Sequence, residues 1–160
     1  MAITYEPIAT TTLGSTASSV TFSSISGSYT DLVLITAAKY TTGSSHIRLQ
    51  YNSDTGNNYS ATAIYGDGAG AFSSRTSNTS SIAIARAGSE FGVGITHIQN
   101  YSNTTTNKTC LSRGDLANSL TIAYVGLYRS TSAITTITLT ADVGSFTTGS
   151  TFSLYGIKSA

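Results

Sequence analysis

Residues 46–52 read His-Ile-Arg-Leu-Gln-Tyr-Asn, and polar and apolar side chains alternate along this stretch without a break. In an extended chain, Ile47, Leu49 and Tyr51 fall on one side and the polar residues fall on the other. A period of two indicates a β-strand with one buried face and one face in water. The stretch therefore predicts a half-buried strand.

Two longer stretches are apolar on both sides of the extended chain. Residues 31–38 read Asp-Leu-Val-Leu-Ile-Thr-Ala-Ala, and residues 120–128 read Leu-Thr-Ile-Ala-Tyr-Val-Gly-Leu-Tyr. Strands that are apolar on both faces are typical of the middle of a sheet that is covered on both sides. We therefore expect these two segments to be central strands with both faces buried.

Shorter runs of β-forming residues fill the rest of the chain, and none has the period of a helix. Further strands are expected at residues 20–25, 59–65, 80–85, 91–101, 108–113, 137–141 and 152–158. Residues 66–78 have little apolar content and predict a long exposed loop. About eight to ten short strands without substantial helix favour an all-β fold, an antiparallel β-sandwich of the jelly-roll type.

The length and composition of the chain predict one uncharged, polar domain. The 160 residues fit a single sandwich domain over residues 1–160, without a linker. Only 9% of the residues are charged, whereas about a quarter are charged in a typical soluble domain. Ser and Thr, roughly a third of the chain, supply the polar surface instead. Such a surface suits packing against other proteins, because little charge must be desolvated.

Several classes of partner are disfavoured by the same composition. The eight Lys and Arg residues are scattered singly, so the basic patch of a nucleic-acid binder is missing. No stretch approaches the roughly 20 apolar residues of a membrane helix, and the first residues do not have the pattern of a secretory signal. Cys110 is the only cysteine, so packing alone must hold the fold, as suits assembly in a reducing cytosol. We expect neither nucleic acid nor membrane as a partner.

Residue types that catalyse reactions or bind metals are few and dispersed. His46 and His97, the only histidines, do not form a zinc-site spacing with Cys110. Residues 52–57 carry oxygen ligands at alternate positions, as calcium loops do, but Ala63 stands where a bidentate acid is needed, which favours a hairpin turn. No Gly-x-Ser-x-Gly motif or short acidic motif is present. We predict no catalytic residue, no metal site and no cofactor, and thus a protein that is not an enzyme.

Four strings of the sequence, taken together, resemble small structural proteins of tailed bacteriophages, including phages of aquatic bacteria and cyanobacteria. They are Tyr-Glu-Pro-Ile-Ala at residues 5–9, Tyr-Thr-Asp-Leu at 29–32, Tyr-Asn-Ser-Asp-Thr-Gly-Asn-Asn-Tyr at 51–59 and Phe-Ser-Leu-Tyr-Gly-Ile-Lys at 152–158. The resemblance implies a β-sandwich virion component in copies related by threefold symmetry. It is either a capsid decoration (cement) protein or a tail-fibre head, and it carries over no catalytic residue.

The first functional hypothesis is a capsid decoration protein, located on the outer surface of the virion and assembled in the host cytoplasm. A homotrimer would bind the major capsid protein of the assembled head and stabilise it, and engaging three sites at once adds roughly two to four orders of magnitude in avidity. Residues 1–8 are expected to form an extended contact arm. Its candidate contacts with the capsid or a neighbouring subunit are Ile3, Tyr5, Pro7 and Ile8.

The alternative hypothesis is a tail or fibre module that recognises glycans on the host surface through loops such as residues 66–78. Aromatic rings commonly stack on sugars, and the chain has ten Tyr and no Trp. The candidate glycan contacts are Tyr40, Tyr59, Tyr65 and Tyr101. The absence of Trp favours the capsid hypothesis over this one.

Overall fold

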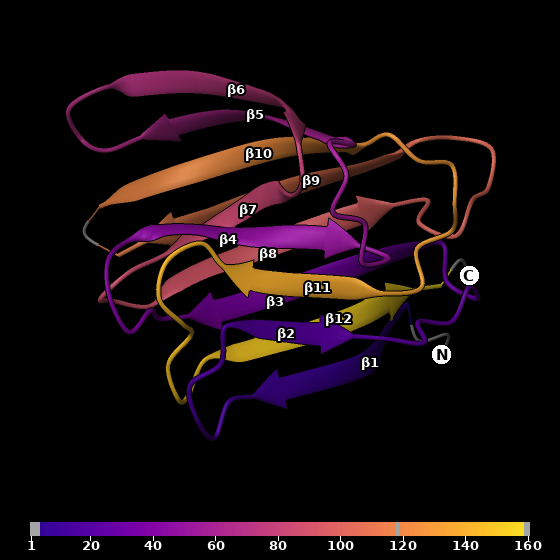
Figure 1. The fold of residues 1–160 in the computed structure, drawn as a ribbon, viewed down its shortest axis with the longest axis horizontal. Coiled ribbons are helices and arrows are strands. Elements are labelled where there is room, and N and C mark those ends of the chain that lie inside the picture. The colour runs from indigo at the N-terminus through magenta and orange to yellow at the C-terminus, as the bar shows by residue number, and fades with distance from the viewer. Residues whose placement is uncertain (1–3, 118, 159–160) are drawn as a thin grey trace.

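Twelve strands and no helix make up the computed structural model, which describes residues 4–117 and 119–158 (Figure 1). Every pair of neighbouring strands is antiparallel, and the strands form two sheets, of eight and four strands, that pack face to face. The predicted all-β antiparallel sandwich is thereby confirmed. Its assignment to the jelly-roll type stays a prediction.

The strand order of each sheet can be followed in Figure 1. The large sheet runs β1 (Tyr5–Thr12), β12 (Thr151–Ile157), β3 (Asp31–Ala38), β8 (Gly92–Gln99), β9 (Lys108–Leu116), β10 (Leu120–Tyr128), β5 (Tyr59–Gly66) and β6 (Ala71–Thr79). The small sheet runs β2 (Ser19–Phe22), β11 (Ile137–Ala141), β4 (Ser45–Tyr51) and β7 (Ile82–Ala87). The β5–β6 hairpin projects at the top of the view, beyond the edge of the small sheet.

The two segments that are apolar on both sides, residues 31–38 and 120–128, are strands β3 and β10 of the large sheet, with the predicted bounds. The predicted loop at residues 66–78 is wrong, because most of it forms β6. This edge strand pairs only with β5 and is exposed along nearly its whole length. With no face to bury, β6 needs no apolar alternation, and its Ser and Thr residues match a loop in composition.

Part of the predicted contact arm, residues 1–8, lies in an edge strand of the large sheet. Tyr5, Pro7 and Ile8 belong to β1, which pairs with β12 from Tyr5–Ile157 to Thr12–Thr151. An edge strand tolerates Pro7 because its backbone nitrogen need not donate to a ladder. The register shifts between Pro7 and Ala9, and the bulged Ile8 packs against the core. Contact of these residues with a capsid stays a prediction, and Ile3 lies outside the described residues.

The core lies between the inner faces of the two sheets. Leu34 and Phe152 of the large sheet and Ile47, Leu49 and Ile84 of the small sheet are completely buried there.

Strand β7 approaches the large sheet so closely that glycines are required opposite it. A Cβ on Gly92 would lie 1.8 Å from the carbonyl oxygen of Arg86, and one on Gly94 would lie 2.8 Å from Cβ of Ala85. The hydroxyl of Ser112 on β9 donates to the carbonyl of Ile84 on β7. The two sheets are thus joined most tightly along β7.

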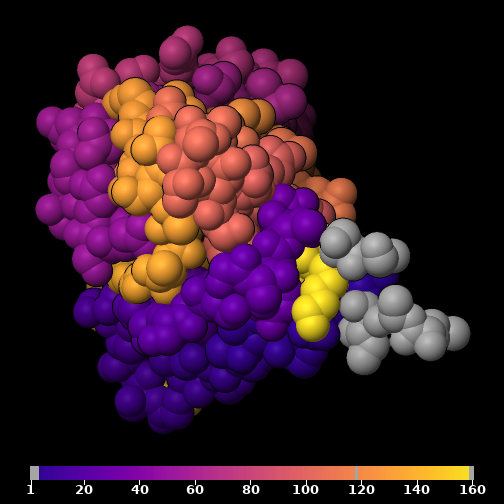
Figure 2. All heavy atoms as spheres, turned by 90° about the vertical axis from the view of Figure 1, so that its right-hand side faces the viewer, coloured from indigo at the N-terminus to yellow at the C-terminus, as the bar shows by residue number. Residues whose placement is uncertain are grey.

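One end of the sandwich is closed by loops that bind one another, and Figure 2 looks onto this end. The loop after β10 donates from the backbone of Ile134 to the carbonyl of Tyr101, 2.9 Å away, in the loop after β8. The Tyr101 hydroxyl in turn donates to Ser26 in the loop after β2. The Asn52 side chain, after β4, donates to the carbonyl of Ala133 at 2.8 Å. These contacts fix the loops on the core.

The two ends of the described chain lie side by side at the same end of the sandwich. The backbone nitrogen of Lys158 donates to the carbonyl of Thr4 at 3.0 Å. Its ammonium group forms an ion pair with Glu6, with Nζ 2.6 Å from Oε1. The antiparallel pairing of β1 and β12 places these residues together.

Candidate functional site

Alternate residues on five neighbouring strands of the large sheet point away from the small sheet and form a surface that we call the outer face. The strands are β3, β8, β9, β10 and β5, and cross-strand partners form three rows on one side of the sheet. The first row is Val33, His97, Leu111, Val125 and Thr62; the second is Ile35, Ile95, Arg113, Ala123 and Ile64; the third is Ala37, Val93, Asp115, Thr121 and Gly66.

Large aliphatic side chains of the outer face are exposed to solvent. The exposed fraction is 62% for Ile64, 57% for Val125, 49% for Leu111, 47% for Val93 and 40% for Ile35. Five strands and three rows cover roughly 500 Å² of sheet, and apolar side chains occupy nine of the fifteen positions. The prediction that β3 and β10 are buried on both faces is therefore wrong for the single chain. Their inner faces are covered, whereas on the outer face Val33 is buried but Ile35 and Val125 are exposed.

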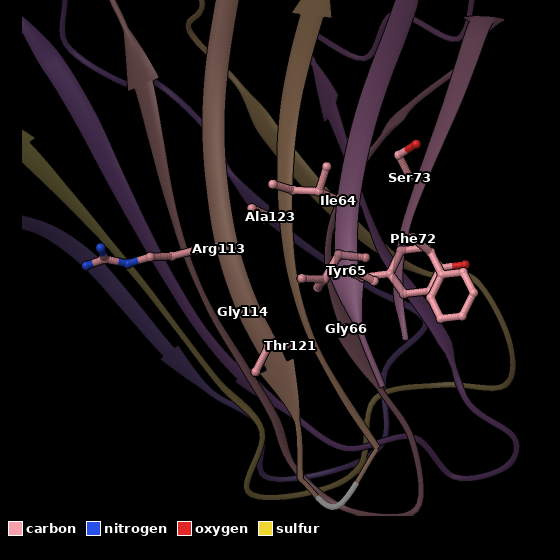
Figure 3. A pocket seen from close by; sticks show the side chains of 11 residues that line it. Ile64, Tyr65, Gly66, Phe72, Ser73, Arg113, Gly114, Thr121 and Ala123 are labelled. Carbon is pink, nitrogen blue, oxygen red and sulfur yellow. The ribbon is translucent and has the colours of Figure 1, made fainter. Parts of the chain in front are cut away.

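Arg113 lines several hollows, two of which are separated by its side chain. One has a volume of about 700 Å³ and is lined by Ile64, Tyr65, Phe72 and residues of β9 and β10. Figure 3 shows the Arg113 side chain reaching away from the adjacent Tyr65 and Phe72 rings. These two rings are stacked, with centroids 5.2 Å apart and planes at 25°. The other hollow, of about 400 Å³, lies between Arg113 and His97.

Charge on the outer face is sparse but of both signs. Arg113 is exposed and Asp115 half-buried, two residues apart on β9. Neither forms an ion pair with any other residue in the described parts of the chain. Because the outer face carries both the positive Arg113 and the negative Asp115, it can pack against the same face of another copy without burying a pair of like charges.

Three of the four tyrosines proposed to contact a glycan are buried in the core, which corrects that prediction. The Tyr40 hydroxyl donates to the carbonyl of His46 at 2.6 Å, and burial raises the pKa of Tyr40 to about 12. Tyr59 stacks on Tyr128, with ring centroids 4.7 Å apart. Tyr101 is buried where the loops meet. Their burial follows from pairings between distant segments, which the sequence pattern does not show.

Tyr65 alone keeps an accessible ring, in its stack with Phe72 on the projecting hairpin. The sequence pattern does not single out Phe72, because residues 66–78 resemble a loop in composition. A signal was available, since Ala71 and Phe72 are the only apolar side chains within β6.

The residues considered for metal binding lie apart from one another. His46 is on β4 of the small sheet, His97 is on the outer face of the large sheet, and Cys110 is buried in the core. Burial raises the pKa of the Cys110 thiol to about 11. Within residues 4–117 and 119–158, no three His, Cys, Asp or Glu side chains lie close enough together to hold a metal ion.

The segment considered for calcium forms a turn that its own hydrogen bonds fill. The Asp54 carboxylate accepts hydrogen bonds from Gly56 N at 2.7 Å, from Asn58 Nδ2 at 2.9 Å and from the Tyr128 hydroxyl at 2.9 Å. Hydrogen bonding by Asn58 and Gly56 lowers the pKa of Asp54. The turn joins β4 to β5, which lie in different sheets, so the predicted hairpin is wrong.

Comparisons with other proteins complete the description of the chain. No helix in the described residues is long and apolar enough to cross a membrane. No family model, no curated protein and no solved structure matches the chain.

Proposed function

We propose that this protein is a non-enzymatic structural component of a tailed-phage particle, a capsid decoration protein that forms homotrimers through the outer face. The trimer binds the major capsid protein on the outer surface of the virion and stabilises the assembled head. The observation that carries the proposal is the exposed aliphatic surface made by Ile35, Ile64, Val93, Leu111 and Val125.

The occupant of the outer face is a second copy of this chain. Strands that are apolar on both faces belong in a sheet covered on both sides, and the small sheet covers only the inner side of β3 and β10. A patch of roughly 500 Å² supplies most of the roughly 800 Å² that each partner contributes to a stable protein interface. Arg113 and Asp115 provide the opposite charges that pairs of copies require.

Oligomeric state in solution is the first test, with Val125→Lys as the variant and Val143→Lys as its matched control. Val143 is also an exposed valine, 37% accessible, but it lies after β11 and outside the outer face. Sedimentation equilibrium should give trimers for the wild type and for Val143→Lys, and monomers for Val125→Lys. Circular dichroism should show the same strand content in all three. A monomeric wild type, or a trimeric Val125→Lys variant, would contradict assembly through this face.

The place in the virion is tested by quantitative mass spectrometry of particles of the phage that encodes this chain. A decoration protein should occur in a number of copies comparable to that of the major capsid protein. A handful of copies per particle would assign the chain to the tail, and its absence from particles would overturn the virion assignment.

The stacked pair of Tyr65 and Phe72 favours one second candidate function, the recognition of host glycans by a tail or fibre module. Phe72 is 45% exposed, and its ring, stacked on Tyr65, offers an apolar face on which a sugar can stack. Under this function, a glycan array should give a signal that Phe72→Ala abolishes. A decoration protein should give no signal on the array.

A further inference from the structure

A separate cavity lies at the open edge of the sandwich, on the inner side of the large sheet. It has a volume of about 190 Å³ and lies between the small sheet and the strands β5, β6 and β10. Its polar lining consists of His46 from β4, Arg86 from β7, Tyr124 from β10, Tyr65 from β5 and Ser74 from β6. These five residues, from both sheets, form what we call the edge cavity.

One cation of the edge cavity has no carboxylate partner. His46 and Arg86 are cross-strand partners between β4 and β7. The nearby Asp142 carboxylate binds Arg48, with Nε–Oδ1 and Nη2–Oδ2 distances of 3.1 and 3.2 Å, and accepts a hydrogen bond from Ser45 at 2.5 Å. Arg86 forms no ion pair with another residue of the described chain. The two guanidinium groups and one carboxylate leave a local charge of one positive unit.

Two donors at the edge cavity are buried without an acceptor. The Tyr124 hydroxyl and Nε of Arg86 find no hydrogen-bond partner among the described residues, and Tyr124 is only 3% exposed. Nearly all buried polar groups in folded proteins are hydrogen-bonded. A guanidinium group can only donate. Both groups can therefore donate to an acceptor in the cavity, and the uncompensated charge of Arg86 favours an anion.

The electrostatics of His46 agree with an excess of positive charge. Burial, together with Arg48 and Arg86, lowers the pKa of His46 to about 4. The Asp142 carboxylate, with Oδ2 3.8 Å from Nδ1, offsets this effect only in part. The imidazole is therefore neutral at neutral pH. Burial also raises the pKa of Tyr124, so its hydroxyl stays protonated and remains a donor.

We propose that the edge cavity binds a compact oxyanion, namely a carboxylate, phosphate or sulfate group, between Arg86 and Tyr124. The planar guanidinium group matches the oxygen geometry of these anions. A volume of about 190 Å³ corresponds to roughly six water molecules at about 30 Å³ each. That space admits an oxyanion group and excludes an oligosaccharide. The proposal goes beyond assembly through the outer face and rests on other residues.

The test is a nuclear magnetic resonance titration of the histidine rings with inorganic phosphate, sulfate and acetate at constant ionic strength. The chain has only two histidines, so His97, on the outer face, is an internal reference for His46. The bound anion should shift the His46 signals saturably and raise its pKa, because it neutralises the charge of Arg86. Comparing the affinities for phosphate, sulfate and acetate identifies the preferred oxyanion.

Three variants make the assignment specific. Tyr124→Phe keeps the ring and removes one donor, so binding should weaken about tenfold. Arg86→Gln should abolish saturable binding. Lys39→Gln removes the same unit charge from a half-buried residue outside the edge cavity and should leave binding unchanged.

Several outcomes would overturn the proposal. These are a His46 shift that never saturates, an equal movement of the His97 signals, or equal weakening by Lys39→Gln and Arg86→Gln. If Arg86→Gln or Tyr124→Phe fails to fold, as His97 would reveal, the wild-type protein still decides the question. An unchanged pKa of His46 in saturating phosphate, sulfate and acetate then rejects the site.

Discussion

Two adjacent rows of side chains on the large sheet lie one residue apart along every strand and point to opposite faces. The buried row carries several polar side chains, and the exposed row carries large aliphatic ones. The inner row is Leu34, Thr96, Ser112, Tyr124 and Ala63, and the neighbouring outer row is Ile35, Ile95, Arg113, Ala123 and Ile64. All five inner residues are buried although three carry hydroxyl groups, and Ile35 and Ile64 of the outer row are exposed although they are aliphatic. In this part of the sheet the buried row therefore carries more hydroxyl groups than the exposed row, and the exposed row carries large aliphatic side chains.

The difference teaches that burial within one chain and burial within an assembly are separate constraints on a sequence. On the inner side, hydrogen bonds such as that between Thr96 and Ser112, 2.9 Å apart, compensate the buried hydroxyls. On the outer side, isoleucine and valine gain nothing in an isolated chain that Thr would not supply. Under the proposed function, contact with another copy of the chain accounts for their presence.

The largest effect that can test this comparison is truncation of matched leucines on the two faces. Leu34 is 0% exposed and Leu111 is 49% exposed. In a monomeric Val125→Lys background, Leu34→Ala should lower the free energy of unfolding by about 3 kcal/mol because it leaves a cavity. Leu111→Ala should change it by less than about 0.5 kcal/mol. Urea unfolding measures both, and equal losses would contradict the division into two faces.

An intermediate effect on the free energy of unfolding is expected at His46, which lies at the open edge of the sandwich. The pKa of His46 falls from its ordinary 6.5 to about 4 in the folded protein. As pH falls from 6.5 to 4, the unfolded chain therefore takes up a proton that the folded chain does not, and stability is lost. The loss should reach roughly 3 kcal/mol at the acidic end of this window.

The His46→Gln variant isolates this contribution. Its free energy of unfolding should vary less steeply between pH 6.5 and 4 than that of the wild type. The groups that face His46 are Arg48, Arg86, Asp142 and Tyr124. The pKa of Asp142 is lowered and that of Tyr124 is raised, so neither of these two groups changes charge over most of that range. Parallel pH profiles for the two proteins would contradict the lowered pKa.

The smallest effect on stability is expected from two similar turns that each contain an aspartate. Asp54 lies in a turn next to the buried aromatic residues, and Asp67 lies in the turn of the projecting hairpin. Asp54 accepts from the Tyr128 hydroxyl in addition to its own turn, whereas Asp67 accepts only from Ala69 N and Gly70 N, at 2.9 and 3.1 Å. Asp54→Ala should destabilise by about 1 kcal/mol, and Asp67→Ala by less. Thermal unfolding of both variants measures the difference, and the reverse order would be inconsistent with it.

The sequence predicts the strands that have a continuous buried face. The alternation in residues 46–52 and the apolar runs at 31–38 and 120–128 correspond to β4, β3 and β10. The edge strands β1 and β6 could not be predicted in this way. Neither has a continuous buried face, so apolar residues do not alternate along it.

The sites escaped prediction for a different physical reason. The outer face needs the sheet order β3-β8-β9-β10-β5, and the edge cavity needs the pairing of His46 with Arg86; both are contacts between distant segments. The apolar runs of β3 and β10 did indicate that both faces of these strands are apolar. They could not show that the small sheet packs on only one of the two faces.

The adjacent chain ends give the protein a defined response to mechanical force. Thr4 and Lys158 lie together, and Tyr5 pairs with Ile157 at the near end of the β1–β12 ladder. Tension applied through these two ends would load the hydrogen bonds of that ladder one after another rather than all at once. Strand β1 would therefore peel away at low force, while the strands beneath the small sheet keep their pairing.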